Sequence, residues 1–465
     1  MNPNFFAYGS FPIYLIYFTG LIQDSLSKTQ DVFIQSILIS RFYSAILSLL
    51  IIPSIYFVGK KLWSERVGLI SAILSTFSVG FIQFAHFGTF EMWLTFFGIW
   101  FFYFSLKLFK EIKLRTVFIV GSIFGLLMAI KVSSLPLLAI PIIAIKRQIF
   151  ITILSLIFIS SIIFTIFSPY VFLDFKSFLS SMQYESSVAF GSLTVFYTGE
   201  FFNSIPVAFQ LVRVYPFLLN PFLTLIFIPS FIYVCFIGLK TKNRSYLLLI
   251  TYYLLLFLPQ AFLFAKWTRY MVPTLPFVYL IIAIFFAHFL KPKKYFNSRY
   301  IGIFVIIIFS FIFSISYFIT AFVKQDTRIQ ASIWAKENIP GDAKIISEVY
   351  DMGIVPFNQY FQNIILFNFY DLDQTSSVGQ AELNNLLSIS DYIILPSQRV
   401  LKSRLNNKNK FSVGNNFYTK LIDQTLGFKK IYETPCDIFC KIIYLGDPVF
   451  AFEQTANVFD RPSVF

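Results

Sequence analysis

The feature that most constrains this chain is a series of long apolar runs separated by short polar connections. About ten runs fill the first 323 residues, and several approach the roughly 20 residues that a helix needs to cross the ~30 Å apolar layer of a bilayer. Charged residues make up only 13% of the chain, against about 25% in soluble domains. We therefore predict a polytopic α-helical membrane protein. The runs cover residues 43–59, 66–84, 91–109, 116–130, 134–145, 149–168, 215–238, 245–264, 272–290 and 300–323, of which the fourth and fifth are short enough to be broken, re-entrant or a partly spanning hairpin.

The connections between the runs alternate in charge, which indicates how the chain is oriented. Short connections rich in Lys and Arg stay on the cytoplasmic side of a membrane. The other connections, the first 40 residues and the tail after Val323 then face the outside. The net charge of +14 is thus the orientation signal of a multi-pass cell-membrane protein, and nucleic-acid binding is not expected. The basic connections lie at 59–66, 107–115, 145–148, 238–244 and 291–299.

From Lys324 onward the composition becomes polar, and this part is predicted to form a small extracytoplasmic α/β domain. A helix, a Pro-Gly turn and a short strand are expected in residues 327–351. The run at 390–397 is typical of a buried strand, and 440–452 offers one or two more. The predicted domains are 1–323, the transmembrane domain, and 324–465, the α/β domain.

Three cysteines are too few for a disulfide framework. Cys436 and Cys440 lie close together in the polar tail and could form one pair. Two free thiols is the simpler interpretation, and the sequence leaves the choice open.

The stretch FIQFAHFGTFEMWLTFF, residues 81–97, contains one of only two histidines, with a carboxylate close by. Glu91 is expected in the first turn of a helix returning into the membrane, where the helix dipole favours a negative charge. A helix cap at Thr89 is the ordinary alternative, but it leaves His86 and Gly88 unexplained. Because ionisable groups near a bilayer cost free energy unless they are paired or hydrated, His86 and Glu91 are candidate catalytic residues.

Three cations occur on the side of the membrane where lysine and arginine are otherwise rare. Lys131 follows an apolar run, and Lys266 and Arg269 lie in the stretch FAKWTRY beside Tyr270. The ordinary alternatives are snorkelling for Lys131 and an interfacial aromatic belt for FAKWTRY. Because a guanidinium grips phosphate bidentately and an ammonium adds a point charge, we favour a phosphate clamp for Lys266 and Arg269.

The outer connection at 169–214 is long, and loops of this length usually carry a lid or a binding element. Its Tyr170, Glu185 and Tyr197 are candidate binding residues, although any one carboxylate in such a loop is more often simply solvated. Cations and a carboxylate on one membrane rim suit a lipid-linked phosphate sugar and an acceptor group. The cations would stabilise the leaving phosphate, and the carboxylate would assist the acceptor as a base or orient it.

Several stretches match the patterns of one known superfamily. They are NPNFFAYGSFPIYL (2–15), RFYSAILSLLIIPSIYFVGKKLWSERVGLISAIL (41–74), HFGTFEMWLTFF (86–97), GLLMAIKVSSLPLL (125–138), SPYVFLDFKSF (168–178), YESSVAFG (184–191), KWTRYMVPTLP (266–276) and, in the tail, DTRIQASIWAKENIP, SDYIILPS and LGF. With them the chain resembles the GT-C superfamily of membrane glycosyltransferases, in its branch of protein O-mannosyltransferases and lipid A aminoarabinose transferases. The likeness covers nearly the whole chain and is greatest to bacterial phospholipid-carrier-dependent glycosyltransferases.

The resemblance implies a GT-C-like, all-α membrane domain followed by the α/β domain, and an enzyme. Its activity would be inverting transfer of a hexosyl or pentosyl group from a polyprenyl-phosphate donor to a protein, lipid or glycan acceptor outside the cell. Glu91 corresponds to the acidic position of the second outer loop, Lys131 to the lysine after the Gly-rich helix, and Arg269 to the arginine associated with the donor phosphate. The predicted catalytic residues are Glu91 and His86, and the predicted substrate-binding residues are Lys131, Lys266, Arg269, Tyr270, Tyr170, Glu185 and Tyr197.

One departure concerns the first outer loop, where the family carries an acidic pair that is a leading catalytic candidate. This chain begins just after that point, and neither Asp24 nor Asp31 fits the motif. We expect a polypeptide truncated at both ends, or else one that lacks this acid. Members of the superfamily can use a divalent cation, but no first-loop carboxylate completes a site with Glu91, so no metal is predicted.

Two other functions fit the composition. One is a transporter or flippase of a lipid-linked or anionic solute, and the other is a catalytically inactive membrane scaffold. Transporters place ionisable groups near the midplane and often show paired halves. Here the polar residues gather at one rim of the membrane and no repeat is visible, which disfavours a transporter. The missing first-loop acid leaves the inactive scaffold as an alternative.

Overall fold

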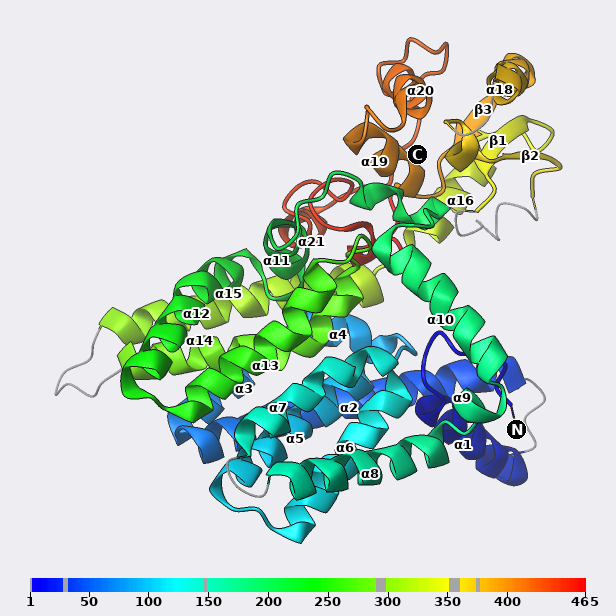
Figure 1. Cartoon of the computed structure of the whole chain (residues 1–465). Helices are drawn as coiled ribbons and strands as arrows, with labels where there is room; N and C mark the ends of the chain where they lie inside the picture. The colour runs from blue at the N-terminus through cyan, green and yellow to red at the C-terminus, as the bar shows by residue number, and fades with distance from the viewer. Residues whose placement is uncertain (1, 28–31, 146–148, 290–297, 351–359, 374–376) are drawn as a thin grey trace. The chain divides into compact units, whose positions relative to one another are not determined.

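The structure is a computed structural model, shown in Figure 1, and it divides into two compact units. The first unit comprises Met1–Ala189, Leu218–Leu263 and Arg269–Ser314, and the second comprises Phe190–Phe217, Phe264–Thr268 and Ile315–Phe465. The residues that the structure describes are 2–27, 32–145, 149–289, 298–350, 360–373 and 377–465.

The first unit is built from helices. Many of them are apolar on nearly every face, as expected of helices that contact both lipid and protein. They are α1 (Phe11–Ser27), α2 (Val32–Leu62), α3 (Glu65–Thr76), α4 (Val79–His86), α5 (Glu91–Lys110), α6 (Leu114–Ile130), the 3-10 helix η1 (Val132–Leu138), α7 (Ala139–Ala144), α8 (Ile149–Phe167), α9 (Tyr170–Leu173), α10 (Phe175–Phe190), α12 (Pro221–Thr241), α13 (Arg244–Ala261), the 3-10 helix η4 (Thr268–Thr274), α14 (Leu275–Phe289) and α15 (Ser298–Phe318).

Within the described residues, six helical segments are long and apolar enough to cross a membrane, and α3 with α4, bent by 57°, forms a seventh if the pair is one span. The protein is therefore a multi-pass membrane protein, and the predicted fold class is confirmed. Two shorter apolar stretches, Leu114–Ile130 and Val132–Ala144, coincide with the two runs predicted to be short. The N-terminal part differs from the prediction, which assigned no apolar run to the first 40 residues: α1 lies within them, and α2 already begins at Val32.

Two glycines let α6 and α8 pack closely, and Figure 1 shows these helices side by side. A Cβ atom on Gly121 would lie 2.9 Å from the Cβ atom of Ile159, and one on Gly125 would lie 2.7 Å from the Cβ atom of Ile163. Lipid gives no hydrophobic driving force between helices, so close backbone approach through small residues supplies the packing energy instead.

The second unit contains a three-stranded parallel sheet in the order β2-β1-β3. The central strand β1 (Lys344–Glu348) pairs with β2 (Asn363–Phe367) and β3 (Tyr392–Ile394). Its neighbouring residues Ile345 and Ile346 are fully buried in two different hydrophobic clusters. Successive strand residues point to opposite faces, so the sheet is covered on both. The described helices of this unit are the π-helices η3 (Gln210–Val214) and η5 (Ile319–Val323), the 3-10 helices η2 (Phe196–Phe201), η6 (Phe369–Asp371) and η7 (Gln454–Ala456), α11 (Tyr215–Leu218), whose last residue belongs to the first unit, α16 (Thr327–Asn338), α18 (Ser377–Ile389), α19 (Arg399–Asn406), α20 (Ser412–Ile422) and α21 (Ile438–Ile443).

The predictions near the C-terminus need two corrections. Residues 440–452 were expected to contain strands, but their first residues belong to α21 and the described structure has no strand there. The side chain of Asp437 caps α21 by accepting a hydrogen bond from the backbone N–H of Cys440 (3.1 Å), a signal that outweighs a short apolar run. Cys436 and Cys440 form a disulfide, so the interpretation as two free thiols is wrong.

A buried group of charges holds distant segments of the second unit together. The Nζ atom of Lys402 lies 2.6 Å from one carboxylate oxygen of Glu200, whose other oxygen accepts a hydrogen bond from the N–H of Gln454 (2.9 Å). Glu453 accepts bonds from the backbone N–H and the hydroxyl of Thr268 (3.0 and 2.7 Å). Burial and the neighbouring Glu200 raise the pKa of Glu453. Unpaired buried charges are costly, so these bonds fix the segments around residues 200 and 268 within this unit.

The glycine contact between α6 and α8 gives a direct test of the packing. Gly125→Ala should destabilise the protein by about 1–3 kcal/mol, because the added methyl group overpacks the interface. Gly302→Ala is the matched control, since nothing lies within 4 Å of a Cβ atom at that position of α15. Thermal unfolding in detergent should show a lower Tm for Gly125→Ala and an unchanged or slightly higher Tm for Gly302→Ala. Equal Tm values for both variants would contradict the close packing.

Candidate functional site

A cavity of about 50 Å³ in the first unit contains most of the charged residues that the sequence singled out. Its walls come from α5, the end of α6, η1, α13 and η4. One part of the lining is polar or charged and the rest is aliphatic, so the cavity is amphipathic. The lining residues are Glu91, Leu94, Gly98, Leu127, Lys131, Ser133, Ser134, Leu137, Tyr252, Leu255, Leu256, Gln260, Arg269, Tyr270 and Pro273.

Glu91 is the first residue of α5, as predicted, and its side chain is buried. Its Oε2 atom has no hydrogen-bond partner among the described residues. The predicted alternative, a cap at Thr89, is wrong: the residue before the helix is Phe90, and no side chain caps α5. The connection is held against α2, because Ser44 donates to the carbonyl of Thr89 (3.3 Å) and a Cβ atom on Gly88 would lie 2.1 Å from the hydroxyl of Ser40. Glu91 therefore enters the cavity from a fixed helix end.

Lys131 lies directly after α6, and the N-terminal segment of the chain packs beside it. The N–H of Gly9 donates to the carbonyl of Ile130 (2.9 Å), and a Cβ atom on Gly9 would lie 2.0 Å from the carbonyl oxygen of Ala129. Only glycine permits this approach, which places the ring of Tyr8 5.5 Å from the Nζ atom of Lys131. The ammonium thus contacts protein aromatic rings, and snorkelling to a lipid surface does not describe it.

Arg269 and Tyr270 lie together in η4, and both line the cavity. The Nζ atom of Lys131 is 4.6 Å from the centre of the Tyr270 ring, and the guanidinium carbon of Arg269 is 5.6 Å from the same ring. Two cations therefore flank one aromatic ring, each close enough for a cation–π interaction. On the opposite wall, the hydroxyl of Tyr252 in α13 donates to the carbonyl of Gly98 in α5 (2.9 Å).

The charges of this site act on one another. Lys131, which lies outside the six spanning segments, has its pKa lowered to about 8 by burial, an effect that Glu91 opposes and Arg269 reinforces. The exposed carboxylate of Glu185 in α10 also acts on Lys131, and burial raises the pKa of the Tyr8 hydroxyl. The structure therefore brings Glu91, Lys131, Glu185, Arg269 and Tyr270 into one electrostatic cluster.

Five predicted residues do not line this cavity, and one of them is Glu185, which acts on Lys131 only through its charge. His86 ends α4 and packs its ring on Phe87, with 4.3 Å between ring centres. Tyr170 begins α9 in the first unit. Lys266 and Tyr197 belong to the second unit: Lys266 donates to the carbonyl of Phe264 (3.2 Å), and the ring of Tyr197 lies 6.0 Å from that of Trp267.

Sequence reasoning missed several polar residues of the site. They are Tyr8, which lies beside Lys131, and Ser133, Ser134, Tyr252 and Gln260, which line the cavity. The stretch around Tyr8 carried a signal, because the dipeptide Tyr8-Gly9 combines an aromatic ring with a residue that permits close backbone contact. The serines and Gln260 sit in apolar runs with no spacing that distinguishes them.

The described residues do not form a complete metal site. No three His, Cys, Asp or Glu side chains in the described part of the chain come close enough to share an ion. Glu91 and Glu185 are the carboxylates whose charges act on Lys131, and a lysine beside them competes with a cation. No step of the chemistry proposed below is derived through a metal.

Comparison with known proteins finds a family model that matches part of the chain. Residues 27–172 match the model of the dolichyl-phosphate-mannose-protein mannosyltransferase family. The match includes Glu91 and Lys131 and confirms, over this part of the chain, the resemblance predicted from the sequence. No curated protein sequence matches the chain.

The solved structures to which this chain is similar include proteins of two groups. The oligosaccharyltransferase of Archaeoglobus fulgidus tethered with an acceptor peptide is 13% identical, with a TM-score of 0.49 over 88% of this chain and 63% of that one. The same organism's AglB with an inhibitory peptide and dolichol-phosphate is 12% identical, with a TM-score of 0.45 over 88% and 64%. ArnT from Cupriavidus metallidurans bound to undecaprenyl phosphate is 10% identical, with a TM-score of 0.47 over 87% and 85%. The chain thus spans less than two thirds of the archaeal proteins.

Proposed function

We propose that this protein is a membrane glycosyltransferase that moves a sugar from a polyprenyl-phosphate donor to an acceptor hydroxyl. The observation that carries the proposal is the cavity in which two cations, Lys131 and Arg269, lie beside a buried carboxylate, Glu91. The family matched by residues 27–172 is named for dolichyl-phosphate mannose and a protein acceptor, which supports the same donor and reaction class. Which sugar and which acceptor serve here is left to experiment.

The cations would bind the donor phosphate. The guanidinium of Arg269 can take two phosphate oxygens and the ammonium of Lys131 a third, so that charge released on the leaving phosphate is neutralised as it forms. The aliphatic lining, with Leu255 and Leu256 among it, suits the first carbons of a polyprenyl chain. At about 50 Å³ the cavity is far smaller than the ~300 Å³ of a typical small-molecule site, so it would hold only the donor phosphate and the first carbons attached to it.

Glu91 would act on the acceptor. An acceptor oxygen bonds to the sugar carbon C1 while the bond from C1 to the phosphate oxygen breaks, and the electron pair of that bond leaves with the polyprenyl phosphate. The acceptor proton passes to the Glu91 carboxylate, whose Oε2 atom is without a hydrogen-bond partner among the described residues. Attack on the face opposite the phosphate inverts the configuration at C1. His86 stays a predicted participant.

The second unit would lie outside the cell, as the sequence predicts for residues 324–465. The disulfide between Cys436 and Cys440 supports this placement, because disulfides persist in oxidising compartments outside the cytoplasm. Together with the charge alternation of the connections, the disulfide supports an extracytoplasmic position for Lys131 and Arg269.

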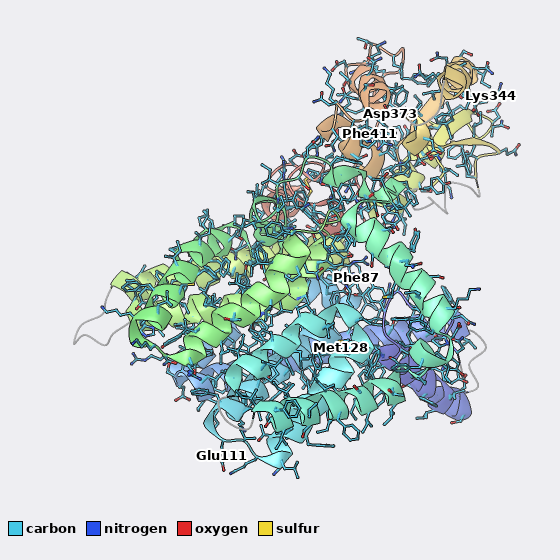
Figure 2. All side chains as sticks on the ribbon, viewed as in Figure 1. Phe87, Glu111, Met128, Lys344, Asp373 and Phe411 are labelled. Carbon is cyan, nitrogen blue, oxygen red and sulfur yellow. A yellow bond between two sulfur atoms is a disulfide. The ribbon has the colours of Figure 1, made fainter. Side chains whose placement is uncertain are left out.

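The central assay is transfer of a labelled sugar from a polyprenyl-phosphate donor by the purified protein in lipid. Glu91→Gln and Arg269→Ala should each lower kcat/KM by roughly 10²–10³, the cost of removing a group that meets charge developing in the transition state. Matched controls are Glu111→Gln and Arg115→Ala, two exposed residues beyond the far end of α5. Figure 2 shows Phe87, which lies before α5, and Glu111, which follows it, well apart in the first unit. Full activity of Glu91→Gln and Arg269→Ala would refute the site, and solute uptake without transfer would favour transport.

The pKa of Lys131 predicts a pH dependence. The protonated ammonium binds phosphate, so kcat/KM, which reports the free enzyme, should fall as the pH rises through about 8. Lys131→Arg keeps its charge in this range and should retain activity above pH 8 without the decline. The measurement is a pH profile of kcat/KM for both proteins. Identical profiles would show that Lys131 does not supply the titrating charge.

A further inference from the structure

A second cavity in the first unit lies where the ends of several helices meet. Its volume is about 280 Å³, close to the ~300 Å³ at which small-molecule sites begin. Leu62 at the end of α2 and Leu106 and Phe109 near the end of α5 form an apolar wall. A polar wall is formed by Lys242 and Asn243, which join α12 to α13, and by Arg244 and Ser245, the first residues of α13. None of these residues lines the cavity of Glu91.

Two cations of the polar wall have no acidic partner in the described part of the chain. Lys242 and Arg244 are both exposed, and among the described residues neither takes part in an ion pair. The acids of the neighbouring basic connections are already paired: Glu65 lies 2.8 Å from Lys60, and Glu111 lies 2.9 Å from Lys113. The positive charge of this cavity is therefore available to an external anion.

The short turn between α12 and α13 holds both cations in place. The guanidinium carbon of Arg244 lies 4.6 Å from the centre of the Phe109 ring, and the side chain of Asn243 accepts a hydrogen bond from the N–H of Ser245 (3.0 Å). Lys242 has the left-handed backbone conformation (φ 52°) in which glycine is usual at the end of a helix. A lysine is thus kept at a position where glycine would be less strained.

We propose that this cavity binds the phosphate headgroup of an anionic phospholipid from the surrounding bilayer. The lining residues lie at the ends of apolar helices, where the headgroup region begins, and basic pockets between helices bind such headgroups. The ammonium of Lys242 and the guanidinium of Arg244 bind the phosphate oxygens. Leu62, Leu106 and Phe109 contact the glycerol and the first acyl carbons. The site goes beyond the proposed function, since it is separate from the donor phosphate site and takes a lipid that is not consumed.

The test is retention of phosphatidylglycerol by the purified full chain in detergent, measured by native mass spectrometry at increasing lipid concentration. Lys242→Gly and Arg244→Gln should each weaken binding about fivefold, the contribution of one basic residue at an anionic surface. Lys242→Gly also removes the left-handed lysine, so its Tm should not fall, which separates lost binding from lost folding. Arg244→Lys keeps the positive charge but loses the two-pronged guanidinium. It should therefore bind phosphatidylglycerol more tightly than Arg244→Gln and more weakly than the unchanged protein. The control Lys113→Gln removes an exposed cation already paired with Glu111 and should bind like the unchanged protein.

Three results would overturn the proposal. Phosphatidylcholine bound as tightly as phosphatidylglycerol would show that the headgroup charge is not recognised. Displacement of the lipid by inorganic phosphate at similar concentrations would make a soluble phosphate the ligand. If Lys113→Gln weakened lipid binding as much as Lys242→Gly does, the overall charge of the protein, and not this cavity, would explain the binding.

Discussion

The balance of buried charge at the end of α6 is the constraint on which the first unit depends. A lysine and an arginine in a poorly hydrated site are tolerated only if opposite charges and polarisable groups surround them. Glu91 supplies the nearby negative charge, and Tyr8 and Tyr270 supply aromatic ring faces. The close approach of Gly9 to α6 holds the Tyr8 ring beside Lys131. The same features that make the charges tolerable leave them facing a cavity, where a phosphate can complete their neutralisation.

Local signals made part of this site predictable. The position of Glu91 followed from its place at the start of an apolar run, and Lys131 and Arg269 stood out because they break the charge alternation of the connections. Tyr8 and Gln260 could not be found in this way, because they reach the site through contacts between segments far apart in the sequence. His86 shows the converse: five residues from Glu91 in sequence, it ends a different helix and does not line the cavity.

The second unit shows the same division between local and distant information. The helix at 327–338 and the strands at 344–348 and 392–394 follow from capping residues and compact apolar runs, and the structure contains them. Strand β2, at Asn363–Phe367, was missed because its run NIILF is short and has no turn signal that separates it from a helix. The inclusion of residues 190–217 in this unit depends on buried contacts such as that between Glu200 and Lys402, which no periodicity reports.

A structure of the protein with a polyprenyl phosphate bound in a lipid environment would test the central claim most directly. The account predicts phosphate density within hydrogen-bonding distance of both Lys131 Nζ and the Arg269 guanidinium, with the lipid chain along Leu255 and Leu256. A phosphate bound elsewhere, with these two cations left in contact only with protein, would contradict it.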